Sequence, residues 1–385
     1  MRTGKAHRST SLEYWDSSAL TRSGLFLAGT VRNEYNGAGQ QTNSTFFVLE
    51  ALATRAECAA LLSAARDAAS TFKIADADSI DGKPTFERYL VEHGEIVHTG
   101  LHDAFVRDAL RDRLVEHVRK ALGCASCELC DVLVRRYLPN ERRVVPPHSD
   151  VNAFATAILT LNAEDFVGGY YMLSHDRASP YDASDDHGDD AAESGDDAHR
   201  LGRSGAMPRF LPLDSGSLLV HDHRVHHGVN VTRGERYALI GWFKDRPGLC
   251  ASDDNPWISE NAAAGDGEAM ELLAKHAEQL GDAARALEWS HKAAAAGHAG
   301  AMIRLAMHLF RSREPVERAE ATRLTAEASR LGRRDAMAVY AWALDKGVGL
   351  SQADPVEALR WRRKAAALGH VGAMRELELV HAGRR

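Results

Sequence analysis

The sequence predicts a β-rich domain with supporting helices, followed by an all-α solenoid. Two observations carry this prediction. Apolar segments with the length of strands recur between Phe46 and Phe243, and turn residues separate them. Beyond Phe243, alanine-methionine pairs recur at spacings of 32, 35 and 37 residues, a period typical of helical units that stack on one another. These pairs are Ala269-Met270, Ala301-Met302, Ala336-Met337 and Ala373-Met374.

The length and composition fit a two-domain globular protein. A chain of 385 residues favours two domains, and 44% hydrophobic with 26% charged residues is ordinary for a soluble fold. We expect a loosely ordered segment over 1–44, a first domain over 45–248 and the helical repeats over 262–385.

Charge and hydropathy narrow the class of partner. The net charge of -7 does not suggest a nucleic-acid surface, and no apolar run is long enough to span a bilayer. The apolar stretch over 25–31 is short and no clear cleavage site follows it, so we do not interpret it as a secretory signal. The sequence therefore predicts a cytoplasmic protein without nucleic-acid or membrane partners.

The first helix of this domain is expected to be amphipathic and to run over 54–69, where Thr54 and Glu57 have the spacing of a capping box. Pro146-Pro147 is expected to end regular structure just before His148. A second helix is expected over 103–122, and strands over 130–138, 157–162 and 216–220.

An acidic segment interrupts this domain at about 181–200. Eight aspartate and glutamate residues crowd the part between Tyr181 and Asp197, with no aromatic residue after Tyr181. One interpretation is an acidic lip that attracts a basic substrate or a second metal. We favour a solvated insertion between two strands, because such a composition buries little apolar surface.

Three cysteines, Cys124, Cys127 and Cys130, have the pattern C-x-x-C-x-x-C. A zinc or iron–sulfur site is one interpretation, but a closed site usually needs four ligands, so Cys58 or Cys250 would have to supply the fourth. We favour ordinary buried thiols at a helix end and in the strand that follows. Five cysteines fit a reducing compartment.

The pattern that carries chemistry is His148-Ser149-Asp150, with a group of histidines and Arg236 further along the chain. Residues two apart on an extended strand point to the same side, so His148 and Asp150 can share one ion. Two histidines and one carboxylate are the set that holds Fe(II) on one face and leaves other positions open. A nearby arginine suits a dicarboxylate, because its planar fork pairs bidentately with a carboxylate.

This ordered set resembles the 2-oxoglutarate- and Fe(II)-dependent dioxygenases of the prolyl and lysyl hydroxylase branch. The resemblance runs from about Phe46 to Phe243 and includes Arg136-Tyr137 ahead of the metal motif and Phe166-Val167-Gly168-Gly169-Tyr170 after it. It implies a double-stranded β-helix (jelly-roll), with Fe(II), 2-oxoglutarate as co-substrate and O₂. The resemblance also implies ascorbate as a further cofactor. Arg236 would bind the distal carboxylate of 2-oxoglutarate, and Tyr137 would add a hydroxyl to it or serve as a core aromatic.

The distal metal ligand has four candidates, His221, His223, His226 and His227. We choose His226, because it lies two residues before a glycine and ten before Arg236, as in the lysyl-hydroxylase-like pattern. His227 lies nine before Arg236, a spacing that some related oxygenases use, so the choice between these two stays open. His221 and His223 are expected to be neighbours of the site or ordinary strand residues.

The helical repeats are similar to the Sel1-like class. The match is strongest over Gly347-Val348-Gly349-Leu350 and Trp361-Arg362-Arg363-Lys364-Ala365-Ala366. Such arrays usually bind other proteins, so a protein partner is expected. His298 and His370 fall at helix ends, where capping is a better interpretation than metal ligation.

Together these features predict a hydroxylase, with His148, Asp150 and His226 holding Fe(II). The expected substrate is a prolyl or lysyl residue of a partner protein that the repeats recruit. One alternative is a non-catalytic adaptor or sensor that acts through its repeats. Another is a small-molecule hydroxylase whose repeats serve assembly.

Overall fold

The computed structural model describes residues 20–23, 26–35, 41–68, 72–75, 84–174, 207–252 and 254–381. The chain divides into two compact units: the first includes Asn43–Ser174 and Pro208–Trp257, and the second includes Ile258–Arg385 together with the short segment Arg32–Thr42. The acidic segment predicted at 181–200 lies outside the described residues. Among the described residues, the structure contains no helix both long and apolar enough to cross a membrane.

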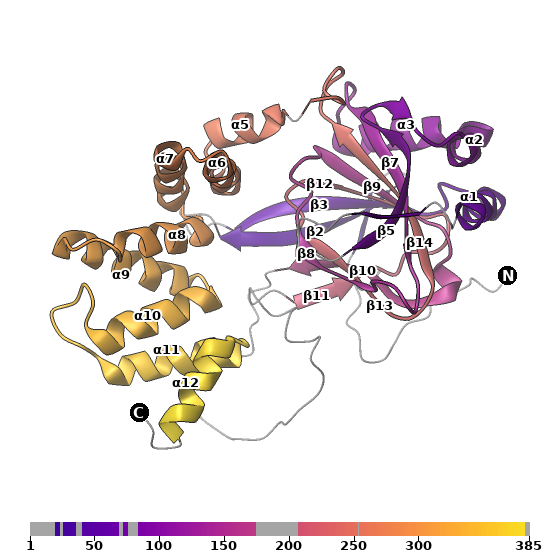
Figure 1. Ribbon diagram of the computed structural model, residues 1–385. Helices are drawn as coiled ribbons and strands as arrows, with labels where there is room; N and C mark the ends of the chain where they lie inside the picture. Colours follow the sequence, from indigo (N-terminus) through magenta and orange to yellow (C-terminus); the bar gives the residue numbers. More distant parts are fainter. Residues whose placement is uncertain are drawn as a thin grey trace. The chain divides into compact units, whose positions relative to one another are not determined.

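The first unit contains two antiparallel sheets. The ten-stranded sheet has the order β1-β2-β3-β12-β9-β14-β7-β5-β4, with β6 paired to β5, and the four-stranded sheet has the order β11-β10-β13-β8 (Figure 1). The strands are β1 Thr21–Ser23, β2 Phe26–Tyr35, β3 Gln41–Leu49, β4 Lys73–Ala75, β5 Thr85–Glu92, β6 Glu95–Ile96, β7 Glu128–Tyr137, β8 Val144–His148, β9 Ala155–Thr160, β10 Phe166–Ser174, β11 Met207–Phe210, β12 Leu218–Asp222, β13 His227–Gly234 and β14 Arg236–Lys244.

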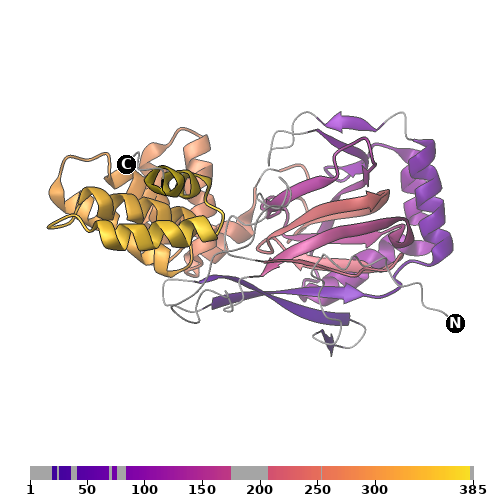
Figure 2. The ribbon, with the colours of Figure 1, turned by 90° about the horizontal axis from the view of Figure 1, so that it is seen from below.

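Helices cover one face of the ten-stranded sheet. They are α1 Arg55–Asp67, α2 Thr99–Val106 and α3 Leu110–Leu122, and Figure 2 shows them along that face. Short 3-10 turns lie at Arg107–Ala109 and Ala163–Asp165. The capping box predicted for the first helix is confirmed, because Glu57 N–H donates to the Thr54 hydroxyl and Thr54 N–H donates to the Glu57 carboxylate.

Alternation along the strands builds two apolar layers. On β7, Val132 and Val134 join the cluster that includes the helices, whereas Leu133 joins a second cluster with residues of the four-stranded sheet. Because successive side chains of a strand point to opposite faces, the ten-stranded sheet contributes to both layers. The second layer, between the sheets, contains Tyr137 and Tyr170.

Within the segment over 1–44, the described residues form β1, β2 and the start of β3, with Phe26 and Val31 buried, and the rest lies outside the described residues. Two local predictions are wrong. Pro146 and Pro147 lie inside β8, an edge strand, where a residue without an N–H group is tolerated. The helix expected over 103–122 is two helices, because Asp108 and Ala109 adopt left-handed backbone angles.

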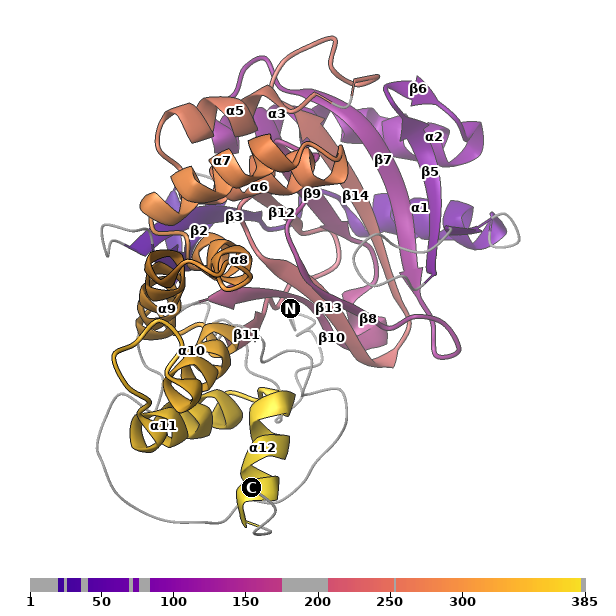
Figure 3. The same ribbon diagram turned by 60° about the vertical axis from the view of Figure 1, so that its left-hand side comes forward.

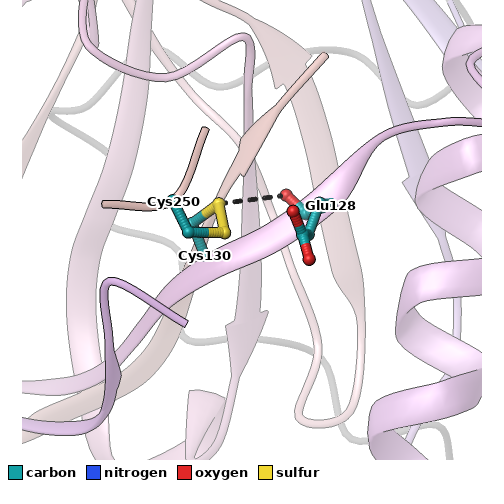
Figure 4. A group of neighbouring side chains, drawn as sticks. All are labelled: Glu128, Cys130 and Cys250. Atoms are coloured by element: carbon teal, nitrogen blue, oxygen red, sulfur yellow. Dashed lines mark hydrogen bonds between the residues drawn. A yellow bond between two sulfur atoms is a disulfide. The ribbon is translucent and has the colours of Figure 1, made fainter. Parts of the chain in front are cut away.

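The expectation of ordinary buried thiols is wrong for Cys124, Cys127 and Cys130, because all three form disulfides. Cys124 pairs with Cys127, and Cys130 on β7 pairs with Cys250 after β14 (Figure 4). The second disulfide spans 120 residues of sequence, and closing a loop of that length stabilises a fold by on the order of 4–5 kcal/mol. It also joins two of the three candidate ligands of the group Glu128, Cys130 and Cys250, so this group offers no thiolate for a metal.

The second unit consists of successive antiparallel-packed helices (Figure 3). They are α5 Pro256–Ala263, α6 Gly267–Gln279, α7 Ala283–Ala295, α8 Ala299–Leu309, α9 Pro315–Arg330, α10 Arg334–Lys346, α11 Pro355–Ala367 and α12 Val371–His381. The capping prediction for two histidines is confirmed, because Nδ1 of His298 accepts from Ala301 N–H and Nδ1 of His370 accepts from Ala373 N–H. The Nε2 atom of His298 also lies 2.8 Å from the carboxylate of Glu268, which links α8 to α6.

The disulfides predict how many thiols react with an alkylating reagent in each state of the protein. Without reductant, the unfolded protein should expose one reactive thiol, that of Cys58, and after reduction it should expose five. In the folded protein Cys58 should react slowly at pH 8, because burial raises the pKa of its thiol to about 11. Alkylation followed by mass spectrometry measures all three states. Five reactive thiols in protein unfolded without reductant would show that the disulfides do not form.

Candidate metal centre

Two strands of the four-stranded sheet bring His148 and His227 together. His148 ends β8, His227 begins β13, and the two residues are direct partners in the antiparallel register. Their rings lie 4.4 Å apart between centroids. Asp150 follows β8 by two residues. The structure brings the side chains of His148 and Asp150 together, as the spacing predicted.

The polar tips of these three residues converge. Nε2 of His148 lies 3.5 Å from Oδ1 of Asp150, and Nε2 of His227 lies 3.6 Å from Oδ2. Each imidazole uses its other nitrogen on a main-chain carbonyl, His148 on Pro146 at 3.0 Å and His227 on Val225 at 3.0 Å. A carbonyl only accepts, so each Nδ1 carries a proton and donates it, and each Nε2 is turned toward the carboxylate.

Asp150 is held as an ionised acceptor. Burial alone would raise its pKa, but His227 and His148 outweigh burial and hold the pKa of this carboxyl well below its usual range. The hydroxyl of Thr156 donates to Oδ2 at 2.5 Å, and Nε1 of Trp242 donates to the same oxygen at 3.3 Å. Burial lowers the pKa of His227 well below its ordinary value, and the nearby Asp150 offsets this only in part.

This donor set fits a divalent cation. His148, Asp150 and His227 each offer one ligand atom, and the three atoms lie within 4.8 Å of one another. Two lone pairs and a negative charge facing one another repel unless a cation or proton lies between them. Two imidazoles and one carboxylate are the ligands that non-haem Fe(II) takes when other coordination positions stay open.

The choice of His226 as the third residue does not match this geometry. His226 lies just before β13 and is half-buried, whereas His227 is the first residue of the strand and is buried. Successive residues point to opposite sides, so only one histidine of the pair can face His148 across the sheet. The structure brings His227, nine residues before Arg236, to this position.

Arg236 and Tyr137 lie on the facing sheet as direct partners on β14 and β7. The Arg236 guanidinium lies 5.1 Å from the centroid of the Tyr137 ring, and both side chains are buried. Burial lowers the pKa of Arg236, and among its neighbours Tyr137 and Tyr170 oppose this. Its Nη1 atom has no hydrogen-bond partner in the part of the chain that the structure describes. A buried cation with an unused donor is a site for an anion.

The sequence did not single out Tyr170, Thr156 or Trp242. The ring of Tyr170 stacks on His227 with centroids 5.2 Å apart. Burial raises the pKa of Tyr170, Asp150 raises it further and Arg236 opposes this. These residues come from strands β10, β9 and β14, far from the motif in sequence. Strand alternation places them on the inner faces, but only the pairing of strands shows which inner residues meet. His221 neighbours the site as expected, with its ring 4.7 Å from that of His227.

No family model matches the chain, and no curated protein matches it either. Parts of the chain are similar to solved structures of 2-oxoglutarate-dependent oxygenases and of Sel1 repeat proteins. A prolyl-4-hydroxylase from Pseudomonas putida has 19% identity and a TM-score of 0.34, over 53% of this chain and 93% of that one. A 2OG-Fe(II) oxygenase family oxidoreductase from Burkholderia pseudomallei has 13% identity and a TM-score of 0.35, over 52% and 86%. A Sel1 repeat protein from Oxalobacter formigenes has 25% identity and a TM-score of 0.29, over 32% and 96%. At such low TM-scores the activity has to be argued from the site itself.

The metal affinity of alanine variants distinguishes the two adjacent histidines, His226 and His227. His227→Ala should weaken binding of Mn²⁺ or anaerobic Fe(II) at least about 100-fold, because one of three ligands is lost. His226→Ala is the matched control and should bind the metal as the wild type does. Equilibrium dialysis of both variants beside His148→Ala measures the affinities. Loss of binding in His226→Ala with retention in His227→Ala would contradict the assignment.

Proposed function

We propose that this protein is an Fe(II)- and 2-oxoglutarate-dependent dioxygenase that hydroxylates its substrate. The observation that carries the proposal is the convergence of His148, Asp150 and His227, with the buried Arg236 on the sheet that faces them. A metal ligand set alone is compatible with many activities. A ligand set with an open face and a buried cation for a carboxylate is what a chelating keto acid requires.

In this proposal His148 and His227 bind the iron through Nε2, and Asp150 binds it through a carboxylate oxygen. When bound, Fe(II) supplies the oxidising chemistry with O₂ while 2-oxoglutarate is converted to succinate and CO₂. The protein's own part is to orient the ligands. Thr156 and Trp242 direct the carboxylate of Asp150, and the carbonyls of Pro146 and Val225 hold the two rings.

Arg236 would bind the distal carboxylate of 2-oxoglutarate through its unused Nη1 donor. Tyr137, whose ring lies against the guanidinium, would contribute its hydroxyl to the same carboxylate. Tyr137 belongs to the apolar layer between the sheets, which also contains Val145 and Val231, and an apolar surrounding that excludes water strengthens an ion pair. We assign these functions to a double-stranded β-helix domain over 45–248.

The proposed substrate is a prolyl or lysyl residue of a partner protein, recruited by a Sel1-like solenoid over 262–385. Ascorbate is proposed as an accessory cofactor. A groove of about 320 Å³ on the helical unit supports protein binding, since Trp342 and Met307 line it and both are partly exposed. Tethering a partner raises the local concentration of its target residue without any new contact at the metal.

The compartment is a separate question. The sequence predicted a reducing, cytoplasmic setting, but two disulfides persist more readily in an oxidising one. We therefore favour an oxidising compartment.

Arg236 gives a test of co-substrate binding that does not need turnover. Arg236→Gln should weaken 2-oxoglutarate binding to the Mn²⁺-loaded protein by about 100-fold, because an uncompensated buried carboxylate costs roughly 3 kcal/mol or more. The exposed Arg233, near the end of β13 and three residues before Arg236, gives the control, since Arg233→Gln should bind as the wild type does. Calorimetric titration measures both, and equal weakening in the two variants would refute the role of Arg236.

Succinate release tests the function as a whole. With Fe(II), 2-oxoglutarate and air, the wild type should release succinate faster when prolyl or lysyl peptides are added, and the peptide should gain one oxygen atom. His148→Ala should release none. Succinate without peptide dependence would favour the small-molecule hydroxylase. No metal binding and no succinate in the wild type would favour the adaptor.

A further inference from the structure

A buried hydrogen bond joins the two sheets beside the metal centre. Tyr170 belongs to β10 of the four-stranded sheet, and His221 belongs to β12 of the ten-stranded sheet. The hydroxyl of Tyr170 lies 2.7 Å from Nε2 of His221. Both side chains are buried, with exposed fractions of 4% and 0%. A polar pair enclosed this completely is retained only where both partners are satisfied.

The direction of this hydrogen bond follows from the second nitrogen of His221. Nδ1 lies 2.8 Å from the main-chain oxygen of Asp222, which can only accept, so Nδ1 carries the proton. Nε2 of the neutral ring is then an acceptor, and Tyr170 donates to it. Both nitrogens of His221 are therefore in use, and it is not one of the three groups that converge on the metal position.

Tyr170 and His221 together enclose the ring of His227. The Tyr170 ring is stacked on it, with an interplanar angle of 18° and centroids 5.2 Å apart. The His221 ring contacts it at 4.7 Å with an angle of 53°. The hydrogen bond from Nδ1 of His227 to Val225 fixes one atom of the imidazole and leaves its plane free to swing. Two rings that are tied to each other remove that freedom.

We propose that Tyr170 and His221 form a positioning pair that fixes the plane of the His227 imidazole, so that its Nε2 lone pair points at the metal. The inference rests on the proposed function only in taking His227 as a ligand. Neither member touches the metal in this assignment. Partners that orient a metal-bound histidine typically change metal affinity by about 10- to 100-fold when they are removed.

Metal affinity and the motion of the His227 ring test this pair without turnover. Tyr170→Leu, which removes the stacked ring, and His221→Phe, which keeps a ring but removes the acceptor, should each weaken Mn²⁺ binding about 10-fold. Tyr170→Phe keeps the stacking and should fall between these variants and the wild type. In metal-free protein labelled with ¹⁵N-histidine, the imidazole resonances of His227 should broaden in Tyr170→Leu and His221→Phe.

Tyr171→Phe is the matched control. Tyr171 is the next residue, is equally buried and donates to the carbonyl of Val145 at 3.3 Å, but it forms no ring contact with His227. This variant should lose thermal stability, because removal of the hydroxyl breaks the buried hydrogen bond to the Val145 carbonyl. Its Mn²⁺ affinity should stay within about threefold of the wild type.

The outcomes separate the two proposals. If the wild type binds Mn²⁺ and Tyr170→Leu and His221→Phe bind it equally well with unchanged His227 resonances, the positioning pair is wrong and the metal site stands. If Tyr171→Phe weakens binding as much as the Tyr170 variants do, the effect is general destabilisation and the pair is again wrong. If the wild type binds no Mn²⁺, the metal site and the positioning pair both fail.

Discussion

The register of β13 against β8 is the constraint on which the site depends. It places His227 opposite His148, and a slip by one residue would turn His227 to the other face. Gly228 contributes to this register, because a Cβ atom there would lie 2.3 Å from the Tyr171 hydroxyl and 2.7 Å from the Val145 oxygen. Any larger residue would push β8 away from β13. The closeness of the two strands at this glycine is what allows two imidazoles to share one ion.

Once the histidines are placed, two buried charges of opposite sign remain to be explained. Asp150 is buried, but His227 and His148 outweigh the burial and hold the pKa of its carboxyl well below the usual range, and Thr156 and Trp242 donate to it. Arg236, on the facing sheet, has an unused donor and is surrounded by aromatic rings. Burial of either charge is costly unless it is paired. A metal ion held by Asp150 and a dicarboxylate bound to Arg236 would each pair one of these buried charges. Ligands of this kind should stabilise the fold in addition to serving the reaction.

The sequence predicted those parts of the site that local rules determine. The two-residue spacing of His148 and Asp150 predicted that they meet, although Asp150 lies in the turn after β8 rather than on the strand. Outside the site, a capping box located the start of α1. The choice between His226 and His227 depends on strand register, which pairs residues about eighty positions apart, and spacing to Arg236 did not decide it. Tyr170 and His221 lie on different sheets, so no local pattern relates them. The helix break at Asp108 contains no proline or glycine, so the sequence did not indicate it. The disulfide partner of Cys130 lies 120 residues away, beyond the reach of a local pattern.

The two metal-facing histidines nevertheless share a local device. Each donates Nδ1–H to the carbonyl two residues before it, so each ring is oriented by its own strand segment before the strands pair. For His148 the acceptor is Pro146, in an edge strand whose prolines have no N–H to offer to another chain. The same residues therefore protect the edge and orient the ligand. For His227 the acceptor, Val225, lies just before β13, which runs between β10 and β8, and neighbouring rings supply further restraint. The orientation of each imidazole is thus set by residues close in sequence, whereas the meeting of the two imidazoles depends on strands far apart in sequence. A metal site requires both, because a correctly oriented imidazole on a displaced strand cannot reach the ion.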